Sequence, residues 1–104
     1  MNRKRDMCFI RIQELFIDVQ MEHNRQIAKW GIQEVSIFEW LNYLTEEIGE
    51  LNKAAAETEY RVFTTEAKKE VYKEAIQCAT LALKIAEMYY PTEVNGSKSQ
   101  EASK

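Results

Sequence analysis

Residues 36–60 read SIFEWLNYLTEEIGELNKAAAETEY, and this stretch decides the fold. Ser36 and Glu39 have the spacing of a capping box, in which each side chain accepts a hydrogen bond from the other residue's backbone amide at a helix start. We therefore expect a helix over residues 37–60. Its apolar positions recur at steps of three and four, which predicts one buried face. That face comprises Trp40, Leu41, Leu44, Ile48, Leu51, Ala54 and Ala55.

Two further helices are expected on either side of this stretch. Residues 6–29 carry apolar side chains at alternating steps of three and four, and Gly31 then offers a C-terminal stop. A third helix is expected over residues 64–90, with Thr64 or Thr65 as its cap and the single proline of the chain after its end. The second half of that helix is unusually apolar, which favours burial between several helices or at a subunit contact.

The fold class that follows is all-α. A chain of 104 residues with three glycines and one proline fits one compact domain and argues against a many-stranded β fold. We expect a helical bundle of three main helices in residues 1–90, and a flexible polar tail in residues 91–104. A core this small favours help from a partner subunit.

Charge and hydropathy exclude several classes of partner. The net charge of −3 gives no support for nucleic-acid binding, and no segment approaches the roughly 20 apolar residues of a membrane span. The basic residues 3–5 are followed by Asp6, so we do not expect a signal peptide and we expect a cytoplasmic protein. Cys8 and Cys78, with one histidine in the chain, are too few ligands for a zinc site.

Carboxylates gather on two of the expected helices. Glu46, Glu47 and Glu50 lie on the second helix, and Glu70 and Glu74 lie on the third. Side chains three and four residues apart project from one side of a helix, so two such helices can surround a hard divalent cation with oxygen ligands. Glu47 falls within the apolar face, where a carboxylate needs a cation or a hydrogen-bond donor. The alternative for Glu46 and Glu50 is a solvated face, with a salt bridge from Glu50 to residue 53.

The order of these acids resembles a known family. Residues 47–50 read Glu-Ile-Gly-Glu and residues 74–77 read Glu-Ala-Ile-Gln. This pair resembles the signature of MazG-like, all-α nucleoside triphosphate pyrophosphohydrolases, in which one helix carries Glu-x-x-Glu and the next Glu-x-x-Asp. The similarity covers about residues 20–90 and is strongest to the short MazG-like proteins often found in phages and mobile elements. It includes residues 24–33, with their Lys-Trp-Gly segment, and residues 39–41, 44–47 and 73–77.

The resemblance implies hydrolysis of a nucleoside triphosphate between its α and β phosphates, which gives the monophosphate and pyrophosphate. Carried over position by position, it implies that Glu47, Glu50 and Glu74 bind magnesium, or manganese in its place. It leaves Glu46 or Glu70 as an outer-shell acceptor or as the base for water. Family members typically build the pocket at subunit contacts, so a homo-oligomer, dimeric or tetrameric, with a four-helix-type bundle is the expected active unit.

Gln77 departs from the family, which has an aspartate at this position. An amide oxygen is a neutral and weaker ligand, so a site that includes Gln77 lacks one negative charge. Three explanations compete: Glu70 replaces that charge, the site binds metal more weakly, or catalysis has been lost.

Candidate contacts to the substrate lie mainly in the first helix. Arg25, Lys29 and Lys53 are cations that would complement a triphosphate, and the alternative for each, favoured for Lys53, is a solvated helix residue. Trp30 would stack on a base, or it closes the apolar stripe of its helix. The leading hypothesis is therefore a magnesium-dependent nucleotide pyrophosphohydrolase. The alternative is a nucleotide-binding or protein-interaction module that keeps the fold and has lost the chemistry at Gln77.

Overall fold

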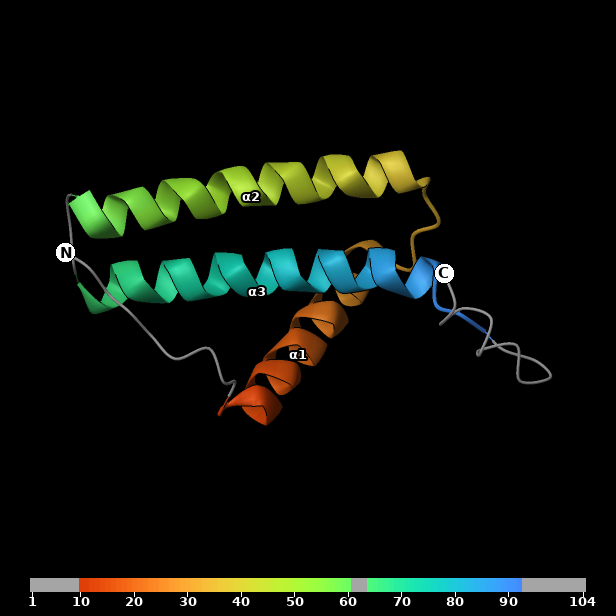
Figure 1. The fold of residues 1–104 in the computed structure, drawn as a ribbon, viewed down its shortest axis with the longest axis horizontal. Coiled ribbons are helices and arrows are strands. Elements are labelled where there is room, and N and C mark those ends of the chain that lie inside the picture. The colour runs from red at the N-terminus through yellow and green to blue at the C-terminus, as the bar shows by residue number, and fades with distance from the viewer. Residues whose placement is uncertain (1–9, 61–63, 93–104) are drawn as a thin grey trace, which may run out of the picture.

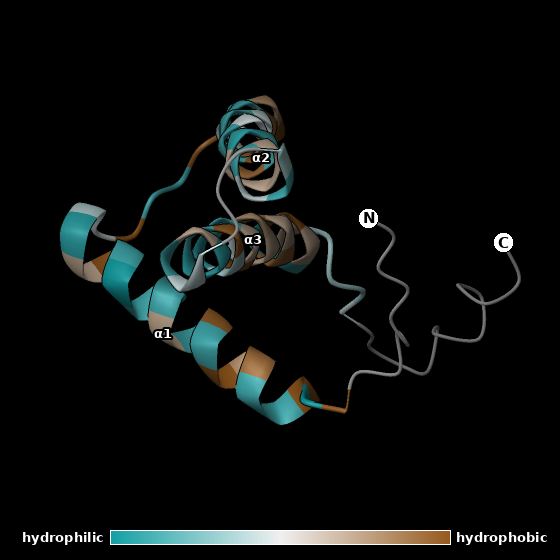
Figure 2. Ribbon diagram, turned by 90° about the vertical axis from the view of Figure 1, so that its left-hand side faces the viewer, coloured by the Kyte–Doolittle hydropathy of each residue, from teal (hydrophilic) through white to brown (hydrophobic). Residues whose placement is uncertain are grey.

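The computed structural model describes residues 10–60 and 64–92, which contain three α-helices and no strand. Helix α1 spans Ile12–Trp30, α2 spans Ile37–Tyr60 and α3 spans Thr65–Met88. Helices α2 and α3 lie side by side and antiparallel (Figure 1). Helix α1 crosses α3 obliquely, on the other side of α3 from most of α2, as Figure 2 shows. The all-α prediction is confirmed for these residues, with α3 as the central helix.

Local hydrogen bonds fix the starts of α2 and α3 as the sequence predicts. The backbone N–H of Ser36 donates to Glu39 Oε1 at 2.9 Å, and the backbone N–H of Glu39 donates to Ser36 Oγ at 3.2 Å. The capping box is therefore present. At α3, Thr64 is the cap, because its Oγ1 accepts from the backbone N–H of Ala67 at 3.1 Å.

The two ends of α1 differ in how well the sequence predicts them. Gly31 adopts a φ of 76°, which suits glycine, and its N–H donates to the carbonyl of Ile27 at 2.7 Å, so the predicted stop is confirmed. The predicted start near residue 6 is wrong at the residues that can be compared. Ile10 and Arg11 form a turn and the helix begins at Ile12, while residues 6–9 lie outside the described ranges. An apolar period shows which face is buried, but it does not mark the first helical turn.

The core that these helices build is small. Among the described residues, Trp40 and Leu81 are the hydrophobic side chains that are buried, each 7% exposed. Buried polar residues accompany them, and the hydroxyl groups of two of these donate hydrogen bonds to backbone carbonyls. Thr80 Oγ1 donates to the Ile76 carbonyl at 2.8 Å, and Thr58 Oγ1 donates to the Ala67 carbonyl, which ties the end of α2 to the start of α3.

Much apolar surface is left exposed on the single chain. On α2, Phe38, Leu41 and Ile48 follow one another at steps of three and seven, and they are 74%, 42% and 44% exposed. The prediction that Leu41 and Ile48 are buried is therefore wrong for one chain, because none of its described helices covers this face. In the described ranges, no helix combines the length and apolar character of a membrane span.

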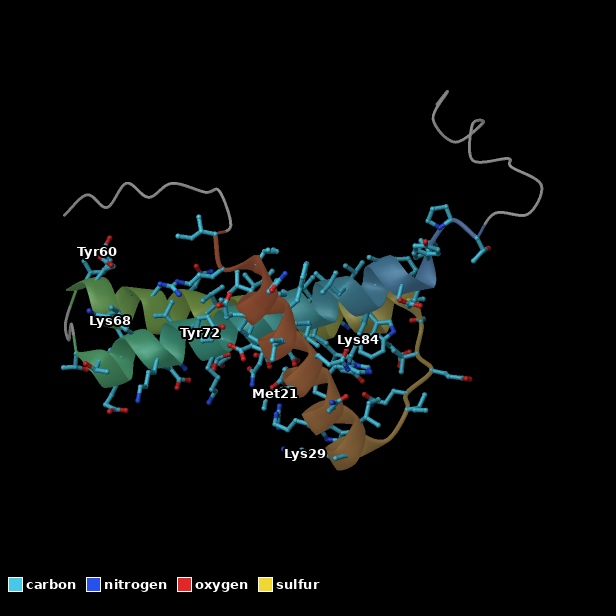
Figure 3. The ribbon with its side chains drawn as sticks, turned by 90° about the horizontal axis from the view of Figure 1, so that it is seen from below. Met21, Lys29, Tyr60, Lys68, Tyr72 and Lys84 are labelled. Atoms are coloured by element: carbon cyan, nitrogen blue, oxygen red, sulfur yellow. The ribbon has the colours of Figure 1, made fainter. Side chains whose placement is uncertain are left out.

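Two hydrogen bonds from α3 hold α1 across its length. The Tyr72 hydroxyl donates to Asp18 Oδ2, and Lys84 Nζ donates to Gln26 Oε1. Figure 3 shows Tyr72 and Lys84 at different points along α3, with α1 passing across it. These bonds join residues more than 50 positions apart in the sequence, so they fix the crossing of α1 over α3.

Candidate functional site

Three glutamates from α2 and α3 meet at one place, and we call Glu47, Glu70 and Glu74 the carboxylate cluster. Glu70 and Glu74 are four residues apart on α3 and therefore share one side of that helix. Glu74 forms side-chain hydrogen bonds with Glu47, on α2, and with Glu70. Its side chain is the most enclosed of the three, since Glu74 is 7% exposed whereas the Glu70 side chain is 49% exposed. The sequence-predicted pairing of acids from the two helices is present at these residues.

The surroundings of Glu74 favour the protonated form of its carboxyl group. The pKa of Glu74 is raised from an ordinary 4.5 to about 7, first because burial removes water from the charged form. Its hydrogen bonds with Glu47 and Glu70 and the negative charge of both residues raise it further. Burial, followed by the charges of Glu47 and Glu74, also raises the pKa of the Cys78 thiol. Lys73 compensates part of the charge of the cluster, since its Nζ lies 3.6 Å from Glu70 Oε2, and the pKa of Glu74 is raised all the same.

Gln77 completes this group through its amide nitrogen. With the amide turned so that Nε2 faces the carboxylates, Nε2 donates to Glu47 Oε1 at 2.8 Å and to Glu74 Oε1 at 3.1 Å. The opposite orientation would set the amide oxygen against two acceptors. Gln77 thus lies beside two of the predicted ligands, where an aspartate would add a fourth negative charge.

The other predicted metal and catalytic residues of α2 are more exposed. Glu50 lies 3.9 Å from Lys53 Nζ, and their side chains are 56% and 80% exposed, so the salt bridge proposed for this pair from the sequence is present. Among the described residues, Glu50 contributes no hydrogen bond to the carboxylate cluster. A cavity lies beside this cluster, and Lys53 does not line it. Glu46 is exposed and does line it.

A cavity of about 500 Å³ adjoins the carboxylate cluster and is lined by all three helices and by the α1–α2 connection. Helix α1 brings both cations, one tryptophan and the acid that pairs with Arg25, whereas α2 brings the other two acids and α3 brings an amide beside them. The lining residues are Glu22, Arg25, Gln26, Lys29, Trp30, Gln33, Trp40, Tyr43, Glu46, Glu47, Gln77 and Leu81. Arg25, Lys29 and Trp30, predicted as substrate contacts, therefore share one cavity with Glu47 and Gln77.

The cations and aromatic rings of this cavity contact one another. Lys29 Nζ lies 4.7 Å and the Arg25 guanidinium carbon 6.0 Å from the centre of the Trp30 ring. Trp30 is 53% exposed, so its interpretation as a core residue is wrong for the single chain. Trp40 is buried instead and meets the Tyr43 ring edge-on, with centroids 5.7 Å apart. The cavity thus pairs a cationic, aromatic side with an acidic side.

The sequence reasoning missed a group of residues that supports the cationic side. Glu22 accepts hydrogen bonds from Arg25 Nε at 2.9 Å and from Arg25 Nη2 at 2.7 Å, and also from Gln26 Nε2 at 2.7 Å. These donors lower the pKa of Glu22, with Arg25 as the largest cause. One signal was available: Gln26 lies three positions after His23 and four before Trp30, so it shares one side of the helix with both.

The described side chains hold no ready-made metal site, and the chain matches no known family, curated protein or solved structure. Within residues 10–60 and 64–92, the side chains as they stand form no group of three or more His, Cys, Asp or Glu that could hold a metal ion.

Proposed function

We propose that this protein is a MazG-like pyrophosphohydrolase that cleaves a nucleoside triphosphate to the monophosphate and pyrophosphate with the help of magnesium. The observation that carries the proposal is the carboxylate cluster, in which a buried Glu74 is held against Glu47 and Glu70. It adjoins a cavity that also contains Arg25 and Lys29. Acids beside cations and aromatic rings match a ligand with a metal-bound, highly negative triphosphate and a planar base.

The donor chemistry of the cluster fits a hard divalent cation. All its candidate donor atoms are oxygens. The pKa of Glu74 is raised first by burial and then by the neighbouring carboxylates, and a bound cation would relieve the second of these effects. Glu47 and Glu74 would hold the metal, with Glu50 implied by the sequence resemblance and Gln77 available if its amide turns. Bound magnesium supplies charge neutralisation on the phosphoryl oxygens and orients water. Manganese prefers similar ligands and would serve in its place.

The residues of this chain would divide the remaining work between binding and proton transfer. Arg25 and Lys29 bind phosphate oxygens, and Trp30, which is exposed at the cavity, stacks on the base. A water molecule attacks the α phosphorus, and the bond from that phosphorus to the bridging oxygen of pyrophosphate breaks. Glu46 or Glu70 accepts the proton of the attacking water and returns it to solvent.

The active unit in this proposal is a homo-oligomer with a four-helix-type bundle. Its support is the exposed apolar stripe of Phe38, Leu41 and Ile48 on α2, which a second copy of the same surface would cover. Light scattering on the purified protein measures the oligomeric state. We expect at least a dimer for the wild type and a monomer for Ile48→Glu, and a monomeric wild type contradicts this part of the proposal.

The activity is tested by incubating the protein with each NTP and dNTP, with and without magnesium, and measuring pyrophosphate release. We expect release that depends on magnesium, and the same panel identifies the base and sugar preference. Absence of release from every nucleotide, at protein concentrations where nucleotide binding saturates, excludes the enzyme. Since nucleoside triphosphates are cytoplasmic metabolites, the proposal also places the protein in the cytoplasm, with neither nucleic acid nor membrane as a partner.

Gln77 supports a second candidate, a nucleotide-binding or interaction module without catalysis. Its amide donates to Glu47 and Glu74 and so compensates part of their charge without any cation. This reading predicts nucleotide binding in a calorimeter with no pyrophosphate in the cell afterwards. Product formation in the same sample decides for the enzyme.

A further inference from the structure

A series of hydrogen bonds runs from α3 through α1 to the cavity, and we call its four residues, Lys84, Gln26, Glu22 and Arg25, the α1–α3 network. Lys84 Nζ donates to Gln26 Oε1, and Gln26 Nε2 donates to Glu22 Oε2 at 2.7 Å. Glu22 then holds Arg25 through both Nε and Nη2. Lysine offers only donors and an ionised carboxylate only acceptors, so the amide of Gln26 has one orientation that satisfies both neighbours.

The two middle residues of this network are enclosed, and its end at the cavity is exposed. Gln26 is 8% exposed and the Glu22 side chain is 11% exposed. Lys84 is half-buried, and its Nζ lies 5.4 Å from the centre of the buried Trp40 ring. Arg25, at the other end, has a side chain that is 49% exposed. The network is therefore anchored inside the molecule and presents one freely accessible group, the guanidinium of Arg25.

The exposed end of the network lies on the same cavity as the carboxylate cluster. Glu22, Arg25 and Gln26 all line that cavity, together with Glu47. The negative charge of Glu47 contributes to the raised pKa of Arg25, after the larger contribution of Glu22, so the guanidinium lies within electrostatic reach of the cluster. Arg25 is thus placed where a phosphate group between the two sides of the cavity would meet it.

We propose that Lys84 is a positioning residue, which acts through Gln26 and Glu22 to hold the Arg25 guanidinium in the orientation that binds a substrate phosphate. This inference rests on the proposed nucleotide function. A free arginine side chain loses rotamer freedom when it binds an anion, and a side chain already held in place loses less. Removing Lys84 leaves the buried oxygen of Gln26 without its donor, and the orientation of Gln26, Glu22 and Arg25 loosens in turn.

The kinetic test is the Lys84→Met variant, which keeps most of the side-chain volume and removes the ammonium group. We expect KM for the preferred nucleotide to rise about tenfold, because the Arg25 guanidinium that binds the phosphate in the ground state is then no longer held in place. We expect kcat to stay within about twofold. Lys84→Arg should restore most of the affinity, and Lys69→Met, an exposed lysine of the same helix, serves as the control that changes neither constant.

A double-mutant cycle separates positioning from general loosening of the fold. In an Arg25→Ala background, Lys84→Met should change the dissociation constant for inorganic pyrophosphate with magnesium by less than about twofold, because the residue it acts through is gone. An equal loss of affinity in both backgrounds overturns the proposal. If Lys84→Met alone does not fold, the double variant Gln26→Leu with Lys84→Met takes its place in the cycle. It removes the donor and the acceptor of the Lys84–Gln26 bond together, so neither is left buried without a partner.

A third measurement distinguishes failure of this inference from failure of the proposed function. The Arg25 Nε–H signal in a nitrogen-15 NMR spectrum reports the order of the guanidinium without any nucleotide. We expect an ordered signal in the wild type and a mobile one in Lys84→Met, with Lys69→Met unchanged. If the wild type releases no pyrophosphate, the proposed function fails and this measurement still decides the network. Equal order in the wild type and Lys84→Met refutes the positioning role of Lys84.

Discussion

Glu22 and Glu74 are two glutamates of similar enclosure whose surroundings push their pKa values in opposite directions. The Glu22 side chain is 11% exposed and its pKa is lowered, chiefly by its hydrogen bonds with Arg25. Glu74 is 7% exposed and its pKa is raised to about 7, by burial and by two neighbouring carboxylates. The difference lies in the partners and not in the depth of burial.

The contrast separates a supporting acid from a candidate binding acid. Glu22 is paired with the positive charge of Arg25 in the same chain. It therefore stabilises the fold and holds the Arg25 side chain in place. Glu74 has a proton where a cation would fit, and it destabilises the folded protein whenever that proton is lost.

The largest effect is expected from Glu47→Gln. This change removes one negative charge from the carboxylate cluster. We expect pyrophosphate release to fall by at least about 100-fold, because a metal ion held less tightly stabilises the transition state less. The matched control is Glu59→Gln, an exposed glutamate further along α2, which should leave the rate unchanged. Unchanged turnover in Glu47→Gln shows that the site is assigned to the wrong residues.

The pH dependence of stability should show both glutamates with opposite signs. Between pH 4.5 and about pH 7, Glu74 keeps a proton in the folded protein that it has lost in the unfolded chain. Stability from Glu74 is therefore full in acid and falls as the pH rises through 7, by about 1 kcal/mol per pH unit at most. Glu22 has a lowered pKa, so its contribution is present at neutral pH and is lost in acid. Thermal unfolding with a chelator present, from pH 2 to 9, measures both effects, and magnesium should reduce the loss of stability that Glu74 causes.

Neutral substitutions at the two glutamates should shift stability in opposite directions. At pH 8 without magnesium, Glu22→Gln should destabilise the protein by about 1–2 kcal/mol, because hydrogen bonds to a charged group are lost. Glu74→Gln should stabilise it by about 1–2 kcal/mol, because a buried, uncompensated charge is removed. Chemical denaturation of both variants gives the values, and shifts of the same sign would remove the contrast between the two residues.

The smallest effect is expected from Gln77→Asp. An aspartate adds negative charge beside Glu47 and Glu74, so the affinity for magnesium should rise roughly threefold to tenfold, while the protein without metal becomes less stable. Calorimetric titration with magnesium measures the first effect and thermal unfolding with a chelator the second. An unchanged magnesium affinity would count against a metal next to Gln77.

The parts of the structure that the sequence predicts are those decided within one or two helical turns. The capping box of Ser36 and Glu39, the Thr64 cap and the Gly31 stop each depend on residues three or four positions apart, and all three are present. Glu47 was identified as a carboxylate on an apolar face, which needs only the helical period. Glu74 and Gln77 of α3 lie beside Glu47, as expected for a carboxylate that faces a neighbouring helix.

The parts that the sequence does not predict are contacts between distant residues. The bond from Lys84 to Gln26 joins positions 58 apart, and the period of either helix does not reveal which residue of one meets which residue of the other. Leu41 and Ile48 were predicted to be buried and are exposed, because the helical period again does not show what lies against that face. An apolar stripe predicts that something covers it, but it does not distinguish a helix of the same chain from a second copy.

The placement of the two tryptophans gives the protein its own optical reporter. Trp40 is 7% exposed, beside Lys84, whereas Trp30 is 53% exposed at the cavity, beside Lys29 and Arg25. The emission of Trp30 should therefore respond to quenchers and to any ligand that stacks on its ring, while Trp40 supplies a shielded reference. Because these are both tryptophans of the chain, binding can be followed in the unlabelled protein by the fluorescence of Trp30 alone in a Trp40→Phe variant.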